Sequence, residues 1–198
     1  MTDTTRMCRF LYELGHLKRT PRTGWLVGGA PGRIESVAEH SFRTAILAHV
    51  VAAAEGASPD RAATLGLYHD MPETRIGDIP YVGRGYLTAV DAETVATHQT
   101  AGMPLAVAEP IRQAIAEFEA RRTTEAVCAK DADKLECLLQ AREYQAAGAA
   151  DIDGWIETST AGLVTATARA LAADAVRMRP GAWWREAVGV ADDGHDDA

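Results

Sequence analysis

The adjacent residues His69 and Asp70 are the pair in this sequence with the clearest chemical potential, because an imidazole and a carboxylate both bind metals. On a helix, consecutive side chains point about 100° apart, so both can reach one ion only if other elements complete its coordination shell. Pro72 follows two residues later and cannot donate a backbone hydrogen bond, so it predicts a kink or a helix end beside the pair. Such a break leaves room for a ligand.

His40 and one acid from residues 130–135 are the candidates that could complete this shell. Ser36 and Glu39 have the spacing of a capping box, which predicts a helix that carries His40 in its first turn. Two imidazoles and two carboxylates form a mixed nitrogen and oxygen site, which suits Mn, Co, Fe, Ni or Zn. The sequence therefore predicts one divalent transition metal, with water in its remaining coordination positions.

Two acids, Asp131 and Asp133, compete for the fourth ligand position. On a helical wheel they fall on different arcs, and neither arc is wholly polar, so periodicity does not choose between them. A salt bridge to Lys130 or Lys134 is the alternative role for either carboxylate.

Residues 18–35 are rich in glycine and proline and are predicted to form a loop that contains Arg22, Trp25 and Arg33. An aromatic ring and two guanidinium groups in such a loop could clamp an anionic ligand. The alternative for Trp25 is packing onto the core.

The composition predicts an all-α fold, because hydrophobic residues make up 47% of the 198 residues while aromatic residues make up only 6%. One domain over residues 1–190 is expected, followed by an acidic disordered tail at 191–198. Helical periodicity and capping residues predict helices over about 4–17, 36–55, 58–70, 89–99, 105–121, 125–147 and 152–178, with Trp183 and Trp184 docking the C-terminal segment.

The net charge of −8 includes four aspartates of the tail, which leaves −4 for the rest of the chain. A mildly acidic body argues against binding to a nucleic-acid polymer. No apolar run approaches the roughly 20 residues that span a membrane, so no membrane association is expected. The three cysteines lack paired spacing, which favours the reducing cytoplasm.

Several short motifs follow one another between about residue 9 and residue 145: Leu17-Lys18-Arg19, Arg22-Thr23-Gly24-Trp25, Glu39-His40-Ser41, His69-Asp70-x-x-Glu73, Gly77-Asp78-Ile79-Pro80 and Lys130-x-Ala132-Asp133. Taken in order, these motifs resemble the HD-domain superfamily, and within it the 5′-deoxynucleotidase branch. The resemblance implies a helical fold and hydrolysis of deoxyribonucleoside 5′-monophosphates to deoxynucleoside and phosphate.

The resemblance also implies roles for single residues. It selects Asp133 over Asp131 as the fourth ligand, places Glu73 and Asp78 in the catalytic centre, and matches Arg22 and Trp25 to residues that contact the nucleotide. From the residues alone, Glu73 could be a solvated helix residue and Asp78 a turn former. The implied set is therefore His40, His69, Asp70 and Asp133 for the metal, Glu73 and Asp78 for catalysis, and Arg22 and Trp25 for the substrate. The loop residues add Arg33 as a further candidate for binding the substrate.

Two other functions stay open from the sequence. One is an HD-type hydrolase of a nucleotide pyrophosphate or a cyclic phosphodiester, and the other is a non-catalytic helical binding protein stapled by its metal. Residues 81–86 and the composition also leave room for a sugar-modified nucleotide as substrate. A homodimer is also predicted, both from Trp183 and Trp184 and from the usual oligomeric state of the family that the sequence resembles.

Overall fold

The computed structural model describes residues 2–88 and 91–190, and the regular elements within them are helices, which confirms the all-α prediction. An isolated β-bridge pairs Pro21 with Ser36. The helices are α1 (Asp3–Leu14), the 3₁₀ helix η1 (Gly15–Lys18), α2 (Thr23–Val27), α3 (Val37–Ala54), α4 (Pro59–Tyr68), α5 (Glu73–Ile76), α6 (Tyr81–Arg84), α7 (Ala92–Gln99), α8 (Leu105–Ala120), α9 (Thr124–Ala146), α10 (Asp153–Ala161), α11 (Ala166–Arg177) and α12 (Ala182–Ala187).

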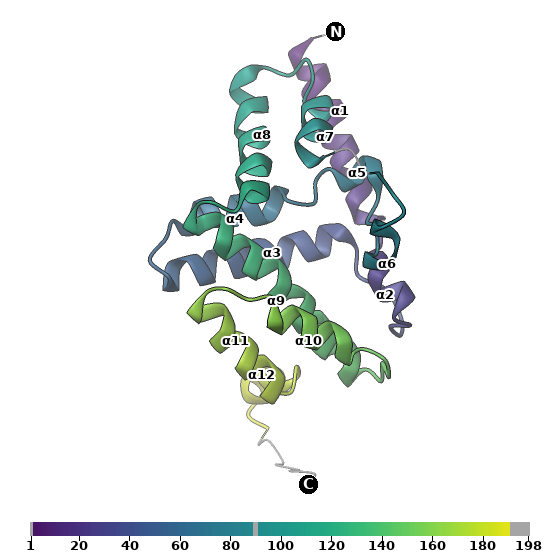
Figure 1. Cartoon of the computed structure of the whole chain (residues 1–198), viewed down its shortest axis with the longest axis vertical. Coiled ribbons are helices and arrows are strands. Elements are labelled where there is room, and N and C mark those ends of the chain that lie inside the picture. Colours follow the sequence, from purple (N-terminus) through teal and green to yellow (C-terminus); the bar gives the residue numbers. More distant parts are fainter. Residues whose placement is uncertain (1, 89–90, 191–198) are drawn as a thin grey trace.

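Helix α9 is the central element of the fold. It packs against α3, α4, α10 and α11, and it runs through the middle of the molecule in Figure 1. Helices α1, α7 and α8 form the upper end in this view, and α10, α11 and α12 form the lower end. Side chains on α9 can therefore contact several of the other helices.

Three clusters of buried hydrophobic side chains hold these helices together. The largest joins α3, α4, α8, α9 and α11 and includes Leu65 and Leu135. The second joins α1, α7 and α8 around Phe10. The third fastens α2 to the end of α9 through Trp25 and Tyr144.

The start of α3 has the capping box that the sequence predicts. The Ser36 hydroxyl accepts a hydrogen bond from the backbone N–H of Glu39, and the Glu39 carboxylate accepts one from the backbone N–H of Ser36 at 2.7 Å. These bonds satisfy helix N–H groups that have no partner within the helix. His40 is thereby held in the first turn of α3.

The predicted break at Pro72 is also present. Helix α4 ends at Tyr68, residues 69–72 form turns, and α5 begins directly after the proline. His69 and Asp70 thus lie where the backbone leaves the helix. The segment 18–35, expected to be a loop, contains the short helix α2, and a second short helix, α6, follows Pro80.

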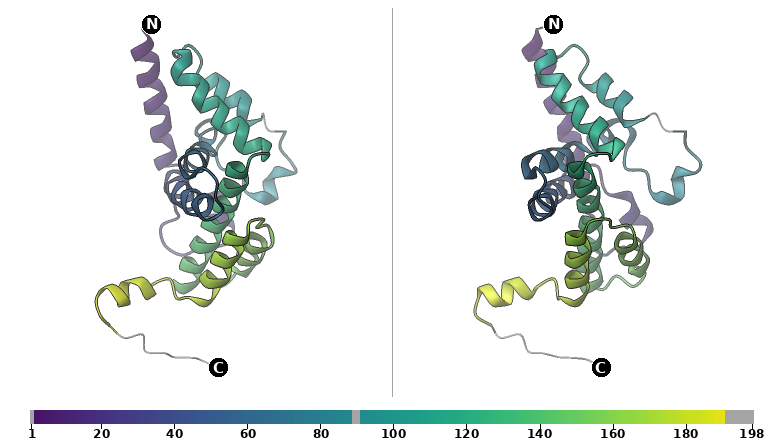
Figure 2. Two further views of the ribbon diagram at one scale, coloured as in Figure 1. Left: turned by 90° about the vertical axis from the view of Figure 1, so that its left-hand side faces the viewer. Right: turned by 60° about the vertical axis from the view of Figure 1, so that its left-hand side comes forward.

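Two expectations for the C-terminal part are wrong. The single helix over 152–178 is two helices, because the chain turns after Gly162 and the Thr165 hydroxyl caps a new helix by accepting from the N–H of Ala168. Trp183 and Trp184 do not dock onto the core, since their exposed fractions are 68% and 58%. Helix α12, which carries them, projects from the lower end of the molecule in Figure 2.

Asp131 explains why the chain turns between α10 and α11. This buried carboxylate accepts hydrogen bonds from the backbone N–H groups of Val164 and Thr165, the latter at 2.7 Å, and from the Thr165 hydroxyl at 2.8 Å. It therefore ties the start of α11 to α9. Asp131 thus caps α11, and does not take either of the roles considered from the sequence, a metal ligand or a salt-bridge partner of a neighbouring lysine.

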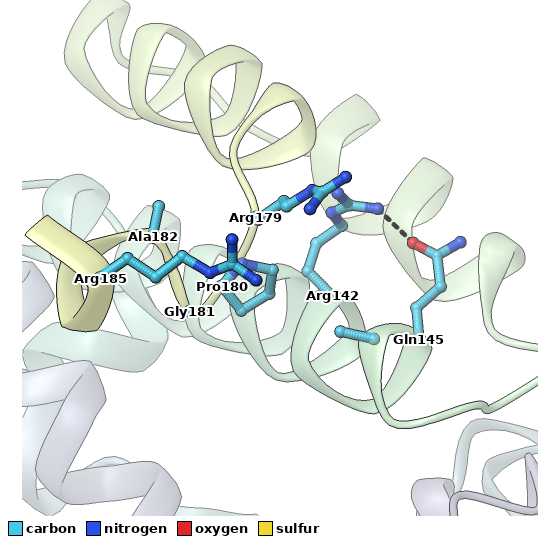
Figure 3. A pocket seen from close by; sticks show the side chains of 8 residues that line it. Arg142, Gln145, Arg179, Pro180, Gly181, Ala182 and Arg185 are labelled. Carbon is cyan, nitrogen blue, oxygen red and sulfur yellow. Dashed lines mark hydrogen bonds between the residues drawn. The ribbon is translucent and has the colours of Figure 1, made fainter. Parts of the chain in front are cut away.

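A cavity of about 410 Å³ lies where the segment after α11 passes the end of α9 (Figure 3). Three of its side chains are guanidinium groups, those of Arg142, Arg179 and Arg185. Arg142 donates hydrogen bonds to the carbonyl oxygens of Ala175 and Met178, so it anchors the end of α11.

The described helices include none with the length and apolarity needed to cross a lipid bilayer. The acidic tail expected at 191–198 and the first residues of the helix expected over 89–99 lie outside the described residues.

Asp131→Ala should reduce the free energy of unfolding by roughly 2 kcal/mol, because it leaves two backbone N–H groups just before α11 without their acceptor. Denaturant unfolding monitored by circular dichroism measures this change. Metal affinity should stay at the wild-type value in this variant and fall in Asp133→Ala. A loss of metal binding with Asp131→Ala, and none with Asp133→Ala, would reverse the assignment of the two acids.

Candidate metal centre

Four side chains from three separate segments converge between α3, α4 and α9. His40 comes from the first turn of α3, His69 from the C-cap position directly after α4, Asp70 from the following turn, and Asp133 from α9. The two Nε2 atoms are 3.3 Å apart. Oδ2 of Asp70 lies 3.1 Å from Nε2 of His69, and Oδ1 of Asp133 lies 3.2 Å from Nε2 of His40.

The other ring nitrogen of each histidine is already used. Nδ1 of His69 lies 2.7 Å from the carbonyl oxygen of Gly66, which can only accept, so Nδ1 carries the proton of the neutral ring and Nε2 is left with a lone pair. Nδ1 of His40 lies 2.5 Å from a carboxylate oxygen of Glu136 and is held as a donor in the same way. The two Nε2 atoms therefore need a proton or a metal ion between them and the carboxylates.

The electrostatics of the cluster also favour a cation. Burial and Arg22 both oppose charge on His40, yet Glu136 and Asp133 outweigh them and raise the pKa of His40 to about 10. Burial alone would raise the pKa values of Asp70 and Asp133, but the two histidines hold both well below the ordinary range. The site thus carries an excess of negative charge that a proton or a metal ion can balance.

The donor set fits a divalent transition metal. Ligands about 2.1 Å from one ion lie roughly 3.0–3.4 Å from their neighbours in octahedral or tetrahedral geometry. The five distances that join a histidine Nε2 atom to another of the donor atoms run from 3.1 to 3.8 Å. Imidazole nitrogens fixed by outer hydrogen bonds, together with carboxylate oxygens, suit the metals that the sequence predicts.

Cys137 offers another possible donor beside His40 and Asp133. Burial raises the pKa of its thiol well above the ordinary value. Its sulfur accepts a hydrogen bond from Arg22 at 3.3 Å. A protonated thiol is a poor metal ligand, so the set with Asp70 is the better candidate.

Glu73 and Asp78 lie near the cluster in different environments. Burial, with the carboxylates of Asp70 and Asp78, raises the pKa of Glu73 to about 10, and its buried Oε2 has no hydrogen-bond partner among the described residues. In contrast, both carboxylate oxygens of Asp78 accept hydrogen bonds. One of its oxygens accepts from the backbone N–H and the hydroxyl of Thr23, and the other accepts from Arg22 at 3.5 Å.

The structure brings Arg22 to the cluster but places Trp25 and Arg33 elsewhere. Arg22 reaches Oδ2 of Asp70 at 3.3 Å. Trp25 is only 2% exposed, and its indole N–H donates to Glu35 at 2.8 Å. Arg33 is exposed and forms two hydrogen bonds with Glu39.

Two residues next to the cluster are absent from the sequence-based predictions: Glu136, which contacts His40, and Arg43, which contacts Glu136. Oε2 of Glu136 is the partner of His40, and its Oε1 accepts from Nε of Arg43 at 2.9 Å. Burial raises the pKa of Glu136, but His40 and Arg43 outweigh this effect and lower it. The signal in the sequence is spacing, since Glu136 follows Asp133 by three residues and Arg43 follows His40 by three.

The chain is similar to proteins of known family. The family model described as HD domain matches residues 14–174. The chain is 34% identical over 142 residues to the 5′-deoxynucleotidase hdd1 of Schizosaccharomyces pombe, which covers 69% of this chain and 71% of that protein. It is 35% identical over 141 residues to the 5′-deoxynucleotidase HDDC2 of Homo sapiens, with coverage of 70% and 68%.

A solved structure supports the same fold. The crystal structure of a predicted metal-dependent phosphohydrolase from Magnetospirillum magnetotacticum superposes with a TM-score of 0.62 at 28% identity. The match covers 88% of this chain and 93% of that one.

Asp70→Asn should weaken Co²⁺ binding strongly, whereas Cys137→Ser should bind Co²⁺ with wild-type affinity, because a carboxylate and not a thiolate completes the donor set. Calorimetric titration of chelator-treated protein measures both affinities. The Co²⁺ absorption spectrum gives a second readout, since a thiolate ligand adds an intense charge-transfer band. Such a band in the wild type, lost in Cys137→Ser, would show that the thiol is a ligand after all.

Proposed function

Since the chain belongs to the HD-domain family, we propose that it is a metal-dependent phosphohydrolase that releases phosphate from (deoxy)nucleoside 5′-monophosphates, a sugar-modified nucleotide included. The observation that carries the proposal is the convergence of four donor atoms beside Arg22 and Glu73. The names of the two curated relatives support the same reaction. Phosphate ester hydrolysis needs a charge-stabilised dianion, an oriented water and a proton for the leaving oxygen.

The metal would be held by His40, His69, Asp70 and Asp133. Bound there, a divalent ion stabilises negative charge on the phosphoryl oxygens and activates a water molecule. Nδ1 of each imidazole has a partner away from the proposed metal, Glu136 for His40 and the carbonyl of Gly66 for His69. Mn, Co, Fe, Ni and Zn all remain candidates on this donor set.

Arg22 is proposed to bind the phosphate. Its side chain lies beside Asp70, and Asp78 holds both its guanidinium group and the start of α2, at whose N-terminal end Arg22 stands. A guanidinium group recognises phosphate oxygens through paired N–H donors. Asp78 accordingly acts as a positioning residue through Arg22 and Thr23.

Glu73 is proposed to hold the proton that the leaving oxygen gains in the reaction. Water forms a new bond to phosphorus while the bond between phosphorus and the sugar oxygen breaks, so that oxygen must gain a proton. The buried Oε2 of Glu73 has no partner among the described residues, which leaves it available to hold this proton.

Trp25 and Arg33, the other two residues predicted to bind the substrate, have structural partners away from the four donor atoms. Trp25 packs against Tyr144 and Trp155 and so fastens α2, and with it Arg22, to the core. Arg33 pairs with Glu39, the residue before His40, and direct contact of Arg33 with a substrate phosphate stays a prediction.

Chelator-treated protein should release phosphate from deoxynucleoside 5′-monophosphates only after Mn²⁺ or Co²⁺ is added back, and His69→Ala or Asp70→Ala should abolish this release. A panel of ribo-, deoxyribo- and sugar-modified monophosphates defines the preference. Release of pyrophosphate from nucleotides, or of a linear nucleotide from a cyclic diester, would favour the other HD-type reactions. Metal binding without any turnover would favour a non-catalytic binding protein in which the metal only holds the helices together.

Arg22→Ala should lower kcat/KM by about 10²–10³-fold, because the variant loses a charge-stabilising donor, and Glu73→Gln should lower kcat by about 10²-fold or more. Steady-state kinetics at saturating metal measure both effects. Arg75→Ala is the matched control, since Arg75 pairs with Glu13 at the surface and should be dispensable for turnover. Equal losses in all three variants would contradict specific roles for Arg22 and Glu73.

The enzyme is further proposed to act as a cytoplasmic homodimer. The exposed rings of Trp183 and Trp184 lie 6.0 Å apart on α12, and burial against a second copy would remove them from water. All three cysteines are free, as expected in a reducing compartment.

Replacing Trp183 and Trp184 together with Ala should convert the dimer into a monomer, because the contact loses its two largest apolar side chains. Light scattering during size-exclusion chromatography measures the mass. A wild-type protein that elutes as a monomer at micromolar concentration would contradict the dimer.

A further inference from the structure

The carboxylate of Glu136 is enclosed between α3 and α9 with an exposed fraction of about 1%. Both of its oxygens have charged partners, since Oε2 contacts Nδ1 of His40 at 2.5 Å and Oε1 contacts Nη2 of Arg43 at 2.7 Å. Arg43 in turn donates to Gln140 and Glu143 at 2.9 and 2.7 Å. A continuous set of polar contacts therefore runs from the surface to a metal-ligand histidine.

The two helices supply these groups in matching registers. On α3, His40 and Arg43 are three residues apart and lie on one face, and on α9 the same spacing separates Asp133 from Glu136. Pairing the faces brings His40 to both acids at once. Asp133 approaches its Nε2 side at 3.2 Å, and Glu136 approaches its Nδ1 side.

The energetic cost of burying these charges calls for an explanation. An ion pair removed from water often contributes less stability than well-packed hydrophobic side chains of similar volume. Glu136 nevertheless lies among the most deeply buried side chains of the described residues. Its clearest effect is on His40, whose ring cannot rotate without breaking the contact at Nδ1.

We infer that Glu136, anchored by Arg43, is a positioning residue that fixes the ring orientation and tautomer of His40 and thereby sets the affinity of the site for its metal. The inference rests on the metal centre of the proposed function. Outer carboxylates that orient metal-bound histidines typically change metal affinity by about 10–100-fold when removed.

Arg43 contributes by holding the carboxylate in place. Three of its nitrogens donate to side chains of α9, so it fixes the distance and register between the two helices at this level. Without Arg43, Glu136 would keep His40 as its only charged partner among these contacts. The carboxylate could then move, and the orientation of the imidazole would be less well defined.

Glu136→Gln and Arg43→Met should each weaken Co²⁺ binding, by about 10–100-fold for Glu136→Gln and by about tenfold for Arg43→Met. Calorimetric titration of chelator-treated protein gives the affinities, and the Co²⁺ absorption spectrum reports the altered ligand geometry. Neither measurement depends on turnover. Arg43→Lys, which retains the charge but not the forked geometry, should lose less affinity than Arg43→Met.

Arg61→Met is the matched control. Arg61 pairs with Glu117 through its Nε at 2.9 Å, and the two side chains are 34% and 22% exposed, close to the 28% of Arg43. The control removes a comparable ion pair between helices, but it has no contact with His40. Its thermal unfolding temperature should fall while its Co²⁺ affinity and spectrum stay at wild-type values.

The outcomes separate the inference from the proposed function. Wild-type affinity and spectrum in both Glu136→Gln and Arg43→Met would overturn the inference, and so would an equal loss of affinity in Arg61→Met. If Glu136→Gln does not fold, the two Arg43 variants and the control decide the question. A wild-type protein that binds no Co²⁺ would overturn the metal centre itself.

Discussion

The arrangement of this protein depends on the need for a cation where α3, α4 and α9 meet. Two imidazole nitrogens lie 3.3 Å apart, and carboxylate oxygens of Asp70 and Asp133 lie beside them. In the absence of a cation these groups would repel one another in a setting where water is largely excluded. The three helices must therefore hold the donors at fixed distances, and the hydrophobic cluster shared by these helices provides the rigidity.

Much of this arrangement can be predicted from the sequence because local rules apply to it. The capping box that starts α3, the Ser58 cap of α4 and the Thr123 cap of α9 depend on residues three positions apart, so each is visible in the chain. His40, His69 and Asp70 could be chosen as metal-ligand candidates from residue type and the proline break. The resemblance to HD domains supplied Asp133, which periodicity alone did not distinguish from Asp131.

The features that sequence reasoning missed depend on contacts between distant residues. Asp131 caps α11 across more than thirty residues, so the break between α10 and α11 has a cause that no local pattern shows. Glu136 and Arg43 meet only because α3 and α9 face each other in one register. The predicted docking of Trp183 and Trp184 failed because large apolar side chains need not be buried within their own chain.

The two arginines beside the centre differ in how completely their donors are satisfied, and this difference separates their roles. Arg43 has short contacts of 2.7–2.9 Å to two carboxylates and an amide, so it has little capacity for another anion. The guanidinium group of Arg22 has longer contacts of 3.3 and 3.5 Å to the carboxylates of Asp70 and Asp78, and its third acceptor is the thiol of Cys137. Phosphate oxygens are better acceptors than a thiol, so a phosphate group gains more from Arg22 than the guanidinium loses by releasing that contact. Arg43 is thus suited to hold the centre together, and Arg22 to receive the substrate.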